Sequence, residues 1–103
     1  MYTQIKLDKS RTLRYTVRSL SRLEEEMDKP LAGMNFDEIR IKDITTILWA
    51  GLLHEDPTIT VDEVMDILDN HEIKLDYVGE KVGKAISDSF AENKNPKKAV
   101  VER

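Results

Sequence analysis

The feature that most constrains this fold is a run of apolar residues near the middle of the chain, Ile47-Leu48-Trp49-Ala50-Gly51-Leu52-Leu53. In a helix these side chains cover nearly every side, so the helix must lie at the centre of a domain or be covered by another molecule. Leu48 and Leu52 define one helical face, and Trp49 and Leu53 define a second. One face can belong to the core while the other meets a partner, and Trp49 suits either role.

Length and composition predict one small domain without cross-links. The chain has 103 residues, of which 40% are hydrophobic, and it contains no cysteine. A chain of this size buries roughly 60–70% of its unfolded surface, which is enough for one modest core. The lack of cysteine excludes disulfides and thiolate metal sites and fits a reducing compartment.

The same sequence gives no sign of a membrane segment. No run approaches the roughly 18 apolar residues of a transmembrane helix, and Met1–Ser10 lacks the apolar core of a signal peptide. We therefore expect a cytoplasmic protein with no membrane partner.

The charge balance argues against a nucleic-acid partner. The net charge is −4, whereas a phosphate-binding surface usually shows as a basic excess. Basic residues do gather near the N-terminus, at Lys6, Lys9, Arg11, Arg14, Arg18 and Arg22. Three consecutive acidic residues, Glu24–Glu26, follow them directly, so this third of the chain is polarised rather than uniformly basic.

The first 15 residues predict a short β-hairpin. Thr3–Leu7 and Arg11–Tyr15 each alternate polar and apolar residues, and Asp8–Ser10 between them is typical of a turn. Strands this short need a further element to pack against.

Two helices are predicted next, with a loop between them. Apolar residues at helical spacing follow Thr16, which suits an N-cap, and Pro30 marks the end of that segment; these residues are Val17, Leu20, Leu23 and Met27. The second helix runs from about Ile41 or Asp43 to His54. The loop from 31 to 40 is expected to anchor on the core through Met34, Phe36 and Ile39.

Two more helices complete the predicted fold. Thr60 and Glu63 match a capping box, which predicts a helix from Val61 to about Asn70. The last helix, from about 74 to 92, carries an apolar stripe at steps of three and four, formed by Leu75, Val78, Val82, Ile86 and Phe90. Gly79 and Gly83 lie four residues apart and are candidates for a close helix approach.

These elements predict a mainly α, small single-domain fold of about four helices with a short N-terminal β-hairpin. Residues 1–93 form the helical domain in this prediction. Residues 94–103 show no periodicity and little apolar content, so we expect a flexible C-terminal tail.

No group of residues predicts catalysis or metal binding. His54, Glu55 and Asp56 resemble part of a metal site, but ligation needs three or four groups from separate elements, and His71 is the one other imidazole. The acidic residues that follow Thr60 lack the glycine and the final glutamate of a calcium-binding loop. Solvated helix termini explain both histidines, and capping and solubility explain the acidic residues after Thr60. We expect a protein that is not an enzyme, with no metal and no cofactor.

Several short motifs follow one another along the chain: Leu13-Arg14-Tyr15-Thr16, Leu20, Leu23-Glu24-Glu25, Leu48-Trp49-Ala50-Gly51-Leu52, Ile59-Thr60, Glu63-Val64 and Ile67-Leu68. Their order resembles the tail assembly chaperones of long-tailed bacteriophages and prophages, including relatives in gene transfer agents. The resemblance spans about Arg11 to Asn70. Gene transfer agent relatives often continue with glycines where this chain has 53–57, so the match is to the broader group.

The resemblance implies a non-enzymatic protein that binds the tape-measure protein and keeps it soluble until tail-tube protein polymerises around it. Such a chaperone is absent from the mature virion, and its gene commonly yields a longer frameshift product as well. We expect the partner surface to be drawn from two apolar sets, which are Trp49, Leu52 and Leu53, and Val78, Val82 and Ile86. Apolar excess on two helices also predicts a homo-oligomer when no partner is present.

Two alternatives of other classes stay open. One is a structural virion component of the head–tail connector type, which would remain in the finished particle. The other is a small helical adaptor or regulator that binds a protein or DNA. A DNA-recognition helix should display several basic residues, whereas the helix from Ile41 to His54 offers only Lys42.

Overall fold

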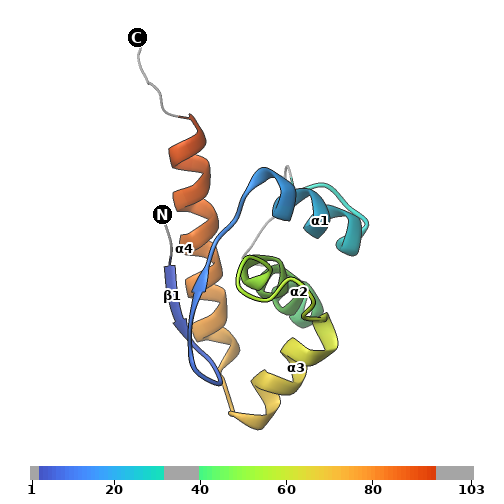
Figure 1. The fold of residues 1–103 in the computed structure, drawn as a ribbon, viewed down its shortest axis with the longest axis vertical. Helices are drawn as coiled ribbons and strands as arrows, with labels where there is room; N and C mark the ends of the chain where they lie inside the picture. Colours follow the sequence, from blue (N-terminus) through green and yellow to red (C-terminus); the bar gives the residue numbers. More distant parts are fainter. Residues whose placement is uncertain (1–2, 32–39, 95–103) are drawn as a thin grey trace.

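A computed structural model describes residues 3–31 and 40–94 of the chain (Figure 1). It contains a two-stranded sheet followed by four helices: β1 (Thr3–Lys6), β2 (Ser10–Leu13), α1 (Val17–Met27), α2 (Ile41–Leu52), α3 (Val61–Asn70) and α4 (Leu75–Lys94). The predicted mainly α fold with an N-terminal hairpin is therefore confirmed. The predicted loop anchors Met34, Phe36 and Ile39 and residues 95–103 of the predicted tail lie outside the described residues.

The apolar helix α2 lies at the centre of the fold. It packs against α1, α3, α4 and β2, and Figure 1 shows it end-on between α1 and α3. Every residue from Thr45 to Leu52 is buried. The hydroxyls of the two threonines in this buried stretch are both hydrogen-bonded: Thr45 and Thr46 donate to the carbonyls of Ile41 and Lys42 at 3.0 and 2.8 Å. The apolar run is thus the core of this domain.

The hairpin covers one side of this core. Its antiparallel register pairs Thr3 with Leu13 and Ile5 with Arg11, and its inward face buries Ile5, Leu7 and Leu13. The Lys6 amide in β1 donates to the Tyr77 hydroxyl of α4 at 2.9 Å. Two short strands therefore gain the packing partners that they need, α4 on one side and α2 on the other.

The close approach in this fold occurs at Gly51 of α2. A Cβ atom there would lie 2.7 Å from the Tyr15 hydroxyl oxygen and 3.0 Å from Leu13 Cδ2. The Gly51 carbonyl also accepts from the Arg14 amide at 3.0 Å. Tyr15 is fully enclosed and its hydroxyl donates to the Ile47 carbonyl at 2.6 Å, while burial raises the pKa of this phenol and keeps it protonated.

The predicted close approach at Gly79 and Gly83 is wrong. A Cβ atom at either position would meet no atom within 4 Å among the described residues. The two glycines lie on a part of α4 where nothing packs closely, whereas Gly51 faces the hairpin. Spacing along one helix cannot reveal this difference, because the packing partner comes from a distant part of the chain.

Local capping signals fix the helix starts as predicted. Thr16 caps α1 by accepting from the Ser19 amide at 3.1 Å, and the Ser19 hydroxyl accepts from the Thr16 amide at 2.8 Å. Thr60 and Glu63 make the same reciprocal pair at the start of α3, at 3.1 and 2.9 Å. Asp28 ends α1 in the left-handed conformation, with φ of 57°.

Candidate partner-binding groove

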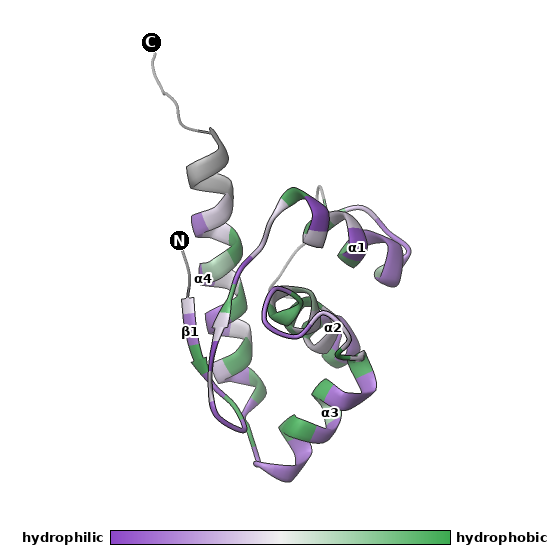
Figure 2. Ribbon diagram, viewed as in Figure 1, coloured by the Kyte–Doolittle hydropathy of each residue, from purple (hydrophilic) through white to green (hydrophobic). Residues whose placement is uncertain are grey.

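The structure places the side chains of the predicted partner surface inside the core. Trp49 and Leu53 are 6% and 8% exposed, and the others are more deeply buried still: Leu52, Val78, Val82 and Ile86. Both faces of α2 are therefore largely enclosed, and only small parts of Trp49 and Leu53 reach the surface. In Figure 2 the green, hydrophobic positions of α4 lie mainly on the side that faces α2. Partner binding by these residues stays a prediction, and in this fold it depends on the surface above them.

A groove on the surface above Trp49 brings three helices together. It lies where α1 and α3 flank α2, and its volume is about 520 Å³. Its lining comes from α1, α2, the α2–α3 connection and the start of α3, and consists of Arg22, Glu26, Lys42, Trp49, Pro57, Thr58, Ile59, Thr60, Val61, Asp62 and Met65. We call this the Trp49 groove. Trp49, a member of the predicted partner surface, reaches this depression, and Leu53 reaches a smaller one beside it.

The indole ring is held rigidly in this groove. The Trp49 Nε1–H donates to the Ile59 carbonyl at 2.8 Å, which ties α2 to the segment that leads into α3. From the other side, the Arg22 guanidinium carbon lies 5.5 Å from the ring centroid, at cation–π distance. A ring fixed in this way loses little conformational entropy when it is covered.

The walls of the Trp49 groove are apolar and its rim is charged. Val61 and Met65 of α3 are half-buried at the wall, beside the buried Ile59. The exposed rim carries both signs of charge, at Arg22, Glu26, Lys42 and Asp62. An apolar centre with a polar rim is the usual anatomy of a protein interface, and a groove between helices suits an amphipathic helix.

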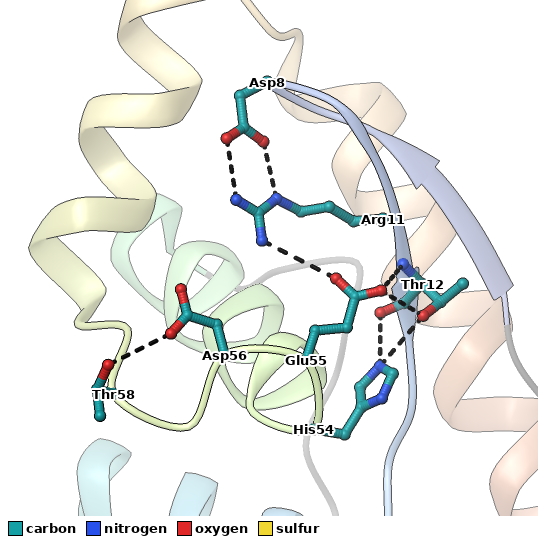
Figure 3. Close-up of polar contacts among 7 residues, drawn as sticks. All are labelled: Asp8, Arg11, Thr12, His54, Glu55, Asp56 and Thr58. Carbon is teal, nitrogen blue, oxygen red and sulfur yellow. Dashed lines mark hydrogen bonds and ion pairs between the residues drawn. The ribbon is translucent and has the colours of Figure 1, made fainter.

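A second polar constellation joins the hairpin turn to the end of α2 (Figure 3). Arg11 is only 7% exposed, and its guanidinium makes two hydrogen bonds with the Asp8 carboxylate, at 2.7 and 2.9 Å. The pKa of Asp8 is lowered by this hydrogen-bonded pair with Arg11. An Arg11 guanidinium nitrogen also lies 3.9 Å from a carboxylate oxygen of Glu55, so Arg11 links the hairpin turn to the end of α2.

Glu55 and His54 fasten the second strand to the end of α2. The Glu55 carboxylate accepts from the Thr12 amide at 2.9 Å and from its hydroxyl at 2.6 Å. The His54 Nε2 atom lies 2.8 Å from the Thr12 carbonyl oxygen. Burial of the Glu55 carboxylate raises its pKa, but the hydrogen bonds from Thr12 outweigh that effect and hold the pKa below its ordinary value.

This constellation connects the hairpin to the end of α2. Its polar groups bind one another across the hairpin and the helix end, and Asp56 accepts a hydrogen bond from Thr58 in the same loop at 3.3 Å. The expectation that a solvated helix terminus explains His54 did not include its contact with Thr12. No sequence signal could have found these contacts, because Thr12 and Glu55 are 43 positions apart.

Within residues 3–31 and 40–94, no three side chains of the types that bind metals are grouped to hold an ion. No helix among those residues is both long enough and apolar enough to pass through a bilayer.

Comparison with known proteins gives no match. No family model fits this chain, and neither a curated protein nor a solved structure shows significant similarity to it.

Proposed function

We propose that this protein is a non-catalytic tail assembly chaperone of a long-tailed bacteriophage or prophage. It binds the tape-measure protein and keeps it soluble until tail-tube subunits assemble around it. The observation that carries the proposal is the Trp49 groove, whose rigid indole and apolar walls lie within a charged rim. The ordered motifs between Arg11 and Asn70 supply the family expectation.

The physical requirements of such a chaperone match this groove. A long helical protein with exposed apolar stripes aggregates unless those stripes are covered. A groove of about 520 Å³ accommodates only a few anchor side chains of a helix, so one chain covers a short stretch. Many copies along one tape-measure protein then mask it by stoichiometric binding rather than by catalysis.

The groove also fits a partner that must be released. Its apolar lining is small and its rim residues, such as Lys42 and Asp62, are solvent-exposed. Exposed charge pairs add little net affinity, so each contact is weak and a competing protein can displace it. Tail-tube protein, which polymerises into a large assembly, can therefore replace the chaperone step by step.

Coexpression with the tape-measure protein of the same phage or prophage genome tests the proposal. We expect this chain to raise the soluble yield of the tape-measure protein and to co-purify with it in several copies. If the tape-measure protein stays insoluble and nothing co-purifies, the chaperone assignment is refuted.

A matched pair of variants shows whether the Trp49 groove is the site. Met65→Glu places a charge on the apolar wall, and we expect it to abolish co-purification. Ile41→Glu makes the same kind of change at a residue that is 65% exposed and does not line the groove, so the complex should survive. Circular dichroism of both purified variants shows whether they are folded. Equal loss in the two folded variants would assign binding to another surface.

Mass spectrometry of purified particles separates this proposal from a structural virion component. A chaperone should be absent from finished particles, whereas a head–tail connector should be present in fixed copy number. Detection of the chain at a constant ratio to tail-tube protein would favour the connector.

A further inference from the structure

A smaller hollow adjoins the Trp49 groove along the same face of α1. It has a volume of about 200 Å³ and is formed by the segment before α1, the first half of α1 and the end of α2. Its lining residues are Arg14, Thr16, Arg18, Ser19, Arg22, Leu53 and His54. We call it the arginine hollow. Leu53 and Ser19 are buried, which gives the hollow a closed floor beneath the basic side chains.

The arginine hollow is basic in a chain that is acidic overall. Three arginines and one histidine line it, no carboxylate does so among the described residues, and the chain as a whole has a net charge of −4. Arg18 is exposed and belongs to none of the ion pairs that involve Arg11, Lys29 and Lys84 among the described residues. Arg22 is also exposed and lies over the Trp49 ring. The charge of Arg18 is therefore available to a ligand.

The charges of α1 run against the preference of its own helix dipole. A helix favours acidic side chains in its first turn and basic ones in its last turn. The first turn of α1 has no acidic residue and contains Arg18, while the last turn has no basic residue and contains Glu24–Glu26. Local choices that oppose stability are expected at functional positions, where binding rather than folding explains them.

Arg22 connects the two depressions, because it lines both the arginine hollow and the Trp49 groove. A segment that lies in the groove therefore passes directly beside the hollow. We infer that the arginine hollow binds carboxylates of an acidic protein segment, so that the helix held in the groove carries acidic residues along one edge of its apolar stripe. This inference rests on the proposed function for the identity of the partner.

Charge distribution favours an acidic protein over a nucleic acid. A nucleic-acid surface needs basic residues along an extended stripe that follows the phosphates. Here the basic series on α1 stops at Arg22 and gives way to Glu24–Glu26 within the same helix. The adjoining apolar groove also suits a protein side chain rather than a sugar–phosphate backbone.

A peptide titration tests the hollow without the partner. The full chain, labelled with ¹⁵N, is titrated with acetylated hexaglutamate amide and, separately, with acetylated hexaglutamine amide at low salt. We expect saturable shifts of the Arg18 and Ser19 amides with hexaglutamate only, and their loss in about 0.5 M NaCl, where screening is nearly complete beyond a few ångströms. Equal binding of the two peptides would overturn the inference, as would tighter binding of an oligothymidylate of the same charge.

Three variants complete the test. Arg18→Gln should weaken hexaglutamate binding about two- to fivefold, the range expected for one exposed ion pair. Lys9→Gln removes one exposed charge from the hairpin turn and should leave binding unchanged. Arg18→Glu should weaken binding further while raising Tm, because it places an acid at the helix N-terminus. A lower Tm in Arg18→Glu, or equal weakening by Lys9→Gln, would show that Arg18 has only a structural role or that binding is non-specific.

The two proposals can fail separately. If hexaglutamate binds in the arginine hollow but the tape-measure protein does not co-purify, the proposed function is wrong and the inference that the hollow binds carboxylates is retained. If the complex forms but hexaglutamate does not bind better than hexaglutamine, the inference about carboxylates is wrong and the groove stands.

Discussion

Substitution of Gly51 by alanine is the sharpest test of how the hairpin and α2 fit together. The added Cβ would lie 2.7 and 2.8 Å from the hydroxyl oxygen and Cζ of Tyr15, and 3.0 Å from Leu13 Cδ2. Tyr15 cannot simply rotate away, because it is enclosed and its hydroxyl donates to the Ile47 carbonyl at 2.6 Å. The ring must shift and give up that bond, or the strand must move away from the helix.

The expected magnitude follows from three terms. Overpacking a core costs about 1–3 kcal/mol, and a buried hydroxyl that loses its partner costs about 1–3 kcal/mol more. Alanine is favoured over glycine in a helix by about 1 kcal/mol, which offsets part of the loss. We therefore expect Gly51→Ala to lower the free energy of unfolding by about 3 kcal/mol and Tm by more than about 10 °C.

Urea unfolding followed by circular dichroism measures this change, with two matched controls. Gly79→Ala and Gly83→Ala make the same substitution where the new Cβ meets no atom within 4 Å. Each control should raise the free energy of unfolding by about 0.5–1 kcal/mol through helix propensity alone.

A double-mutant cycle with Tyr15→Phe locates the strain. Removal of the hydroxyl relieves the 2.7 Å contact, so Gly51→Ala should cost less in the Tyr15→Phe background than in the wild type. If Gly51→Ala is as stable as the wild type, or if its cost is unchanged by Tyr15→Phe, the close packing inferred here is wrong.

Three further outcomes are expected. Thr60→Ala should lower the free energy of unfolding by about 1 kcal/mol through loss of the α3 cap, measured by urea unfolding. Glu55→Gln should destabilise the protein at neutral pH, and this difference in Tm from the wild type should shrink as the pH falls below the ordinary Glu55 pKa of 4.5, because a lowered folded-state pKa gives stability that acid removes. Glu80→Gln makes the same change at an exposed position of α4 and should leave Tm at neutral pH unchanged. Trp49→Phe should cost about 1–3 kcal/mol by leaving the Ile59 carbonyl unpaired, and should also weaken co-purification of the partner, whereas partner binding without loss would exclude the indole as the floor of the site.

Features that depend on neighbours in the sequence could be predicted. The Thr60–Glu63 box and the Thr16 cap each need only four consecutive residues, and both form as expected. The central position of α2 also followed from its composition, since a helix that is apolar on nearly every side has to be covered.

Features that depend on distant partners could not be predicted. The apolar pattern of α2 was also compatible with one face left for a partner, but the hairpin, α1, α3 and α4 together enclose both faces. Gly51 differs from Gly79 only in facing Tyr15, which lies 36 positions earlier in the chain. The link from Arg11 to Glu55 likewise arises only when the hairpin folds back onto the end of α2.

The positions of the Trp49 groove and the arginine hollow follow from the limited packing of α1 against the rest of the fold. The hairpin and α4 pack against each other and also against α2, whereas α1 packs mainly against α2 alone. The outer sides of α1 are thus left open, and they form a wall of both the Trp49 groove and the arginine hollow. The buried Leu20 and Leu23 hold α1 to the core. The exposed side of this helix can therefore carry a charge such as Arg18, which opposes the helix dipole. The enclosed core gives stability, and this lightly packed helix gives the surface on which a partner can be bound and released.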